Sequence, residues 1–185
     1  LREIRIARRD AQELPALERE YIVAAESYFA RSNSDAEQHY RRILKNYPFE
    51  TEARLFLIYI LYDQNEFDEA LANATVLAAQ EPDSEVAWGA IGDLNLRLKR
   101  FEDADLALKR YLELAPENPN AQLLLGDSLL LRRRYEEART HYEKAIGLDP
   151  GFGSAHLQLA YVDYLTDQWS SALARFSSLA TSDMH

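Results

Sequence analysis

A proline recurs every 34 residues along this chain, at Pro48, Pro82, Pro116 and Pro150. Five alanines share the spacing: Ala36, Ala70, Ala104, Ala138 and Ala172. Only 6 of the 185 residues are proline, so chance does not explain four of them at one preset interval. A period of roughly 20 to 50 residues is typical of repeat architectures. The chain is therefore predicted to fold as stacked copies of one small unit.

Each unit is predicted to contain two helices. In the fourth, Ala121, Leu124 and Leu125 fall at three- and four-residue spacing, which indicates one apolar face of a helix. A second such face follows from Tyr135 through Ala145, and Pro150 comes just beyond it, where proline ends a helix. The alanines are predicted to lie where the paired helices cross closely, opposite small residues on the facing helix: Ala24, Gly92, Gly126 and Ala160.

The pattern Leu125-Gly126, Tyr135, Ala138 and Pro150 resembles a tetratricopeptide repeat (TPR), as does its counterpart one period earlier. The resemblance covers about residues 17–182 and implies an all-α, right-handed superhelical solenoid of antiparallel helix pairs. The predicted divisions are a lead-in helix or remnant of a preceding repeat (1–16), then repeats at 17–50, 51–84, 85–118, 119–152 and 153–185, the last truncated and uncapped.

The chain departs from the family pattern in one column of the first helices. The family's usual aromatic residue is replaced there by Ser27, Leu61, Asn95, Leu129 and Asp163. Because buried polar groups are nearly always hydrogen-bonded, Asn95 and Asp163 are predicted to need partners.

Composition and spacing argue against several kinds of chemistry. A net charge of -10 disfavours nucleic acid as a partner, because phosphate contacts need basic surfaces. The chain has no cysteine, and no histidine has metal-ligand spacing. His39 and His141 share a second-helix column that is predicted to face solvent. The longest apolar run, 55–62, is too short to span a membrane. We expect no enzyme activity, catalytic residue, cofactor or metal.

The candidate binding site follows from the resemblance, which implies a concave groove lined by the first helices. Asp93 and Asp127 lie one period apart in that lining, and tyrosines recur toward both ends, although Tyr62 and Tyr164 can equally serve as packing residues. Acidic and aromatic groups together favour a basic peptide or helix with apolar anchors. The predicted groove residues are Tyr28, Tyr59, Tyr62, Asp63, Asp93, Leu96, Arg97, Asp127, Leu130, Tyr161 and Tyr164.

One family subtype is disfavoured. TPR domains that hold the acidic C-termini of heat-shock chaperones use Lys and Asn side chains on their first helices. The corresponding positions here are Tyr21, Ala25, Phe56, Val86 and Ala90, so that carboxylate clamp is absent.

The expected function is that of a non-enzymatic protein–protein interaction scaffold or adaptor. One alternative is a regulatory segment of a larger bacterial enzyme such as a serine/threonine kinase, since Glu13-Leu14-Pro15 and Tyr28-Phe29 resemble arrays attached to such proteins. Another is a self-assembling structural scaffold, because Trp169, Leu173 and Phe176, with Ala172, would leave an open apolar flank. An excess of Arg over Lys, 17 to 4, suggests a bacterial source. The expected compartment is the cytoplasm, or the periplasm if a signal segment was removed.

Overall fold

The chain is all-α. The computed structural model describes residues 15–182, and within that range it contains ten helices and no strand. The predicted lead-in segment therefore lies almost entirely outside the described residues. The helices are α2 (Ala16–Phe29), α3 (Asn33–Asn46), α4 (Thr51–Asp63), α5 (Phe67–Gln80), α6 (Glu85–Arg97), α7 (Phe101–Leu114), α8 (Pro119–Leu131), α9 (Tyr135–Leu148), α10 (Gly153–Leu165) and α11 (Trp169–Ser182).

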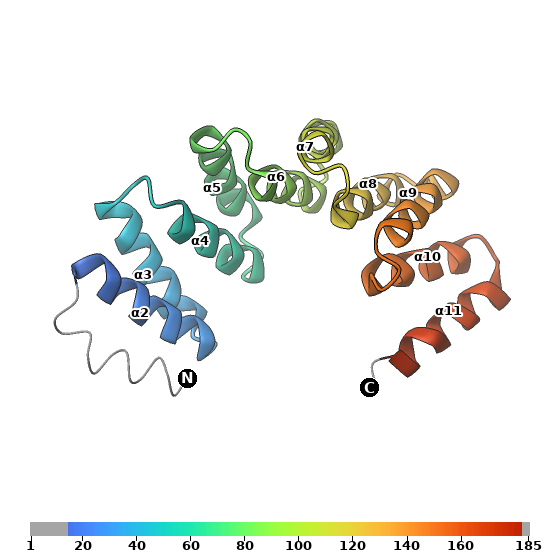
Figure 1. Ribbon diagram of the computed structural model, residues 1–185, viewed down its shortest axis with the longest axis horizontal. Helices are drawn as coiled ribbons and strands as arrows, with labels where there is room; N and C mark the ends of the chain where they lie inside the picture. The colour runs from blue at the N-terminus through green and yellow to red at the C-terminus, as the bar shows by residue number, and fades with distance from the viewer. Residues whose placement is uncertain (1–14, 183–185) are drawn as a thin grey trace. The chain divides into compact units, whose positions relative to one another are not determined.

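The helices are grouped in two compact units, Leu1–Ala87 and Trp88–His185, and the division falls inside α6. In the first unit α2 packs on α3, α3 on α4, and α4 on α5 (Figure 1). In the second, α7 packs on α8, α8 on α9, α9 on α10, and α10 on α11. Each unit is thus a stack of helical hairpins.

The turn inside every hairpin has the same backbone. Its central residue has φ between 58° and 63°, and the five positions are Arg31, Asn65, Lys99, Arg133 and Asp167. In the fourth hairpin the N–H of Arg134 donates to the carbonyl of Leu129 at 2.9 Å, and that of Arg133 to Leu130 at 2.9 Å. This is the Schellman end of a helix, which usually uses glycine. No glycine occupies these positions, so the sequence gives little sign of the turn.

The predicted alanine column is buried. Ala36, Ala70, Ala104 and Ala138 are 0% exposed and Ala172 is 3% exposed. The partners of two facing glycines differ from the expectation: a Cβ added to Gly92 would overlap Leu108, and one added to Gly126 would overlap the ring of Tyr142. Leu108 and Tyr142 each lie one helical turn beyond the column alanine. The glycines therefore make room for a large side chain as well as allowing the helices to approach.

A polar contact recurs between the two helices of a hairpin. His39 Nδ1 lies 2.8 Å from Glu20, and His141 Nδ1 lies 2.9 Å from Gln122. Both histidines are half-buried, so the expectation that they face solvent is wrong. The reason is that the first helix carries a polar side chain 19 residues earlier, at the same level of the hairpin.

Candidate functional site

A cavity of about 290 Å³ lies in the second unit, and we call it the Asp127 pocket. Residues of α6, α8 and α10 contribute to it, together with the turn that follows α6. Because Asp93 and Asp127 are one period apart, successive first helices bring them to the same cavity. Its charged and polar lining is Asp93, Arg97, Lys99, Asp127 and Gln158, and its apolar lining is Leu96, Leu130 and Leu131.

The carboxylate of Asp127 is held by neutral donors. The Tyr142 hydroxyl donates to its Oδ1 at 2.8 Å, and Gln158 Nε2 donates to the same oxygen at 3.1 Å. Within the described part of the chain, Oδ2 accepts no hydrogen bond. Burial raises the pKa of Asp127 to about 6; the charge of Asp93 adds to the rise, while the two hydrogen bonds and the charge of Arg97 oppose it. The pocket thus holds a carboxylate whose charged form is poorly compensated.

Asp93 is in a different state. Its Oδ1 lies 3.3 Å from Nε of Arg97, one helical turn further along α6. The two acids predicted from the sequence therefore line one cavity but are not equivalent, because Arg97 already neutralises Asp93. Among the described residues, no basic side chain forms an ion pair with Asp127.

The other predicted groove residues are distributed over several surfaces. Leu96 and Leu130 line the Asp127 pocket, whereas Tyr161 and Tyr164 stack on each other with ring centroids 6.3 Å apart and do not line it. Tyr164 also meets the ring of Trp169 edge-on at 5.1 Å.

Four predicted residues belong to the first unit. Tyr59 and Asp63 are exposed, and Tyr28 lines a separate cavity. Tyr62 is half-buried and meets Phe67 edge-on at 5.6 Å, which favours the packing role over the binding role for this residue.

The predicted groove residues do not include Lys99, Leu131 or Gln158, which also line the pocket. Gln158 lies 31 residues after Asp127 on the next first helix. It lies three residues, or about one helical turn, before the predicted groove residue Tyr161 on α10, so a prediction that included that turn would have found it. Lys99 is in the left-handed turn after α6, outside any helical column.

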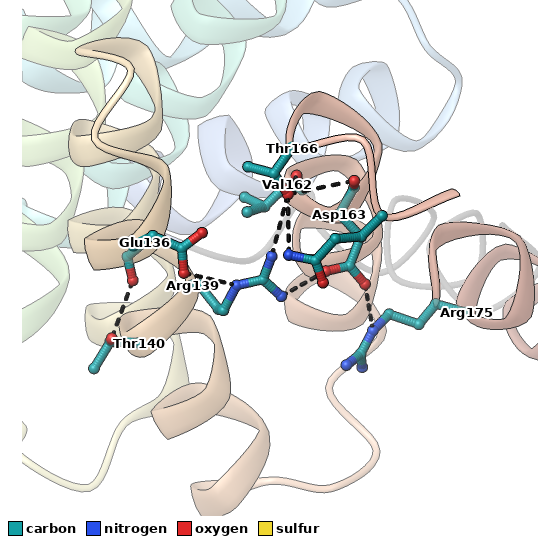
Figure 2. Close-up of polar contacts among 8 residues, drawn as sticks. Glu136, Arg139, Thr140, Val162, Asp163, Thr166 and Arg175 are labelled. Carbon is teal, nitrogen blue, oxygen red and sulfur yellow. Dashed lines mark hydrogen bonds and ion pairs between the residues drawn. The ribbon is translucent and has the colours of Figure 1, made fainter. Parts of the chain in front are cut away.

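Asp163 is one of the two polar residues predicted to need hydrogen-bond partners, and it is 0% exposed. Its Oδ1 accepts from Arg139 of α9 at 2.5 Å, and its Oδ2 accepts from Arg175 of α11 at 2.9 Å (Figure 2). Asn95 instead donates to the backbone carbonyl of Ile91 at 2.9 Å. Asp163 joins three helices and is closed to a ligand.

Residues 15–182 contain neither a cluster of metal-binding side chains nor a helix suited to cross a membrane. No three histidine, aspartate or glutamate side chains are gathered closely enough there to hold a metal ion. None of the helices in that range combines the length and apolar character needed to cross a membrane.

Comparison with known proteins agrees with this architecture. Sequence models of the tetratricopeptide repeat family match residues 24–85, 61–119 and 90–151, and a further one matches 129–184. The chain belongs to the tetratricopeptide repeat family.

Several known proteins are similar to it. MamA (41-end) from Desulfovibrio magneticus RS-1 is 18% identical, with 89% of this chain and 93% of that chain covered and a TM-score of 0.74. A thermophilic TPR protein of Thermus thermophilus, TTC0263, is 19% identical, with 89% and 90% covered and a TM-score of 0.76. At these identities the likeness shows the fold alone.

A relative by sequence is the chloroplastic PsbB mRNA maturation factor Mbb1 of Chlamydomonas reinhardtii. It is 41% identical over 51 residues, which are 28% of this chain and 8% of that protein. The match is therefore confined to a short part of a much longer relative.

Proposed function

We propose that the chain is a non-enzymatic interaction scaffold that binds a basic peptide or helix with apolar anchors at the Asp127 pocket. The fold is one whose members generally serve as interaction scaffolds. The proposal of a basic ligand rests on the environment of Asp127. Its charged form is disfavoured by burial, the residue lines a cavity, and its Oδ2 accepts no hydrogen bond from the described residues. A side chain that lowers stability at a pocket is typical of a residue kept for function.

The lining of the pocket supports a particular ligand chemistry. Leu96, Leu130 and Leu131 can contact the aliphatic part of a side chain, while Asp127 Oδ2 accepts from its charged end. Lysine and arginine combine those two parts. Because Asp93 is engaged with Arg97, the incoming cation is expected to pair with Asp127.

A peptide-display selection against the full chain tests this proposal. Selected peptides are expected to carry Lys or Arg flanked by apolar residues, and Asp127→Asn should weaken their binding about tenfold or more. Asp103→Asn is the matched control, because Asp103 is exposed on α7 and outside the pocket. Selection of acidic peptides, or equal affinity for the Asp127→Asn chain, would overturn the proposal.

The salt dependence of binding is a further prediction. Long-range attraction between a basic peptide and this chain of net charge -10 is screened over about 10 Å at 0.1 M salt and about 3 Å at 1 M. The affinity of a selected peptide should therefore fall as sodium chloride rises through that range, as measured by calorimetry. An affinity independent of salt would indicate an apolar contact instead.

Self-assembly is a second candidate, favoured by the outer face of α11. Trp169, Leu173 and Phe176 form a row along that helix and are 55%, 68% and 37% exposed. A row of large apolar side chains is a surface for association. Sedimentation of the full chain should then show mass rising with concentration, and Leu173→Lys should abolish the rise. A monomer at all concentrations would exclude this candidate.

A further inference from the structure

The first unit contains a second cavity, of about 360 Å³, between α2 and α4. Of the predicted groove residues only Tyr28 lines it, and the function proposed above does not use it. Its walls are mainly aromatic, and we call it the aromatic pocket. It is lined by Tyr21, Ile22, Ala25, Tyr28, Phe29, Tyr40, Glu52 and Phe56.

The rings of the aromatic pocket hold one another in place. Phe56 stacks on Tyr40, which is 1% exposed, with centroids 5.2 Å apart and an interplanar angle of 8°. Tyr28 meets Phe56 edge-on at 5.8 Å and Phe29 edge-on at 5.8 Å. Tyr21 is fixed by its hydroxyl, which donates to Glu50 at 3.1 Å. The ring surfaces are therefore arranged before any ligand arrives.

One residue of the pocket lining, Glu52, is acidic. Glu52 precedes Phe56 by one turn of α4, so both side chains reach the same cavity. Among the described residues no basic side chain forms an ion pair with Glu52, and none lines the pocket. Ring faces beside an uncompensated carboxylate attract a cation that has an apolar stem.

We propose that the aromatic pocket binds an arginine side chain of a partner peptide. The methylene stem packs against Ile22 and Ala25, and the planar guanidinium lies over a ring and pairs with Glu52. The overall charge of -10 favours the approach of a basic partner. The proposal does not depend on Asp127, because the two pockets share no residue and lie in different units.

A pair of peptides that differ only in charge tests this proposal. The probe is a blocked peptide, Leu-Ser-Leu-Arg-Leu-Ser-Gly, and its control has citrulline, which keeps the shape of arginine but is neutral. Both are titrated into the full isotope-labelled chain carrying Asp127→Asn, so that the other pocket does not compete. We expect amide shifts in 21–29 and 52–56, upfield shifts of the arginine methylene protons, and affinity at least tenfold weaker for citrulline.

Variants then assign the contact. Phe29 is 61% exposed and Glu52 is exposed, so Phe29→Leu and Glu52→Gln should fold normally and weaken arginine binding at least fivefold. The matched controls are Phe49→Leu, at a residue 81% exposed outside the pocket, and Glu18→Gln on α2; both should bind as the parent does. Equal affinity for arginine and citrulline, shifts confined to other residues, or unchanged binding by both pocket variants would each overturn the proposal.

Discussion

Two partly or fully buried carboxylates in the second unit have opposite environments. Asp163 is fully buried between the guanidinium groups of Arg139 and Arg175, which compensate its charge. Asp127 is held by a phenol and an amide, which donate hydrogen bonds but carry no charge. Asp163 therefore stabilises the fold through two ion pairs, whereas burial raises the pKa of the Asp127 carboxyl.

The pH dependence of stability follows from the raised pKa of Asp127. With a pKa of about 6 in the folded chain and about 4 when unfolded, the folded state binds more protons between those values, so stability rises as pH falls through 6. Asp127→Asn keeps both hydrogen bonds and removes the charge. Urea unfolding should show the variant more stable than wild type by about 1–3 kcal/mol at pH 7.5 and equal to it near pH 4.

Asp103→Asn, at an exposed position outside the pocket, is the control and should unfold at close to the urea concentration of wild type. A stability difference for Asp127→Asn that is constant with pH would show that the Asp127 carboxyl has an ordinary pKa.

Asp163 should be critical for stability. Asp163→Asn leaves two arginines beside a neutral group, and removing one partner of a buried ion pair costs about 3–5 kcal/mol. Glu136→Gln is the matched control, because Glu136 lies 3.3 Å from the same Arg139 and its side chain is 72% exposed. Exposed pairs contribute about 1 kcal/mol or less. Similar midpoints in chemical denaturation for both variants would contradict this account.

At the scale of the element, the hairpin turns carry a local conformational cost. Their five central residues have positive φ and none is glycine. L-residues with a Cβ pay roughly 1–2 kcal/mol in this region, and asparagine tolerates it better than arginine. The turn is nevertheless kept because the packing of the two helices on each other determines where the chain must reverse.

Substitution of these residues by glycine tests the cost. Arg133→Gly should stabilise the chain by about 0.5–1 kcal/mol, because glycine adopts positive φ without strain. Asn65→Gly should change stability by only a few tenths of a kcal/mol, since asparagine is already tolerated there. The measurement is thermal and urea unfolding. A larger gain at Asn65 than at Arg133 would show that backbone strain is not the deciding factor.

At the scale of the whole molecule, contacts are local along the chain. The described helices that pack extensively on each other are neighbours in chain order. A further contact, between α8 and α10, is slight. An array of this kind approximates a one-dimensional system in which each unit depends mainly on its neighbours. Damage to one hairpin should therefore spread only to the adjacent ones.

The substitution Ala138→Leu tests the close packing of the two helices and how far along the chain a local disturbance spreads. The alanine is 0% exposed at the crossing of α8 and α9, so the larger side chain should overpack the hairpin and cost about 1–3 kcal/mol. Hydrogen exchange should quicken in α8, α9 and α10 and remain unchanged in α2 to α5. Equal loss of protection in all helices would show that the chain unfolds as one cooperative block.

The 34-residue period and the apolar spacing inside each repeat together predict the helical hairpins. Ala104 and Ala138 recur at a fixed interval, and only a repeated close crossing of two helices requires a small residue there. The same spacing indicates that Asp93 and Asp127 lie at equivalent positions of successive first helices, because residues one period apart lie side by side in stacked repeats. A repeat makes this inference possible, because residues one period apart occupy equivalent environments several times along the chain.

Only the tertiary structure decides how individual side chains are paired. Nothing in the period shows that Tyr142 would reach Asp127 from the second helix, or that Arg175 of another helix would pair with Asp163. The aromatic pocket arises where Phe29 and Glu52, on different helices, meet one cavity. Such pairings depend on rotamers and on distances between helices that are not encoded in any one column. The period therefore defines the scaffold, and the three-dimensional packing defines the candidate sites.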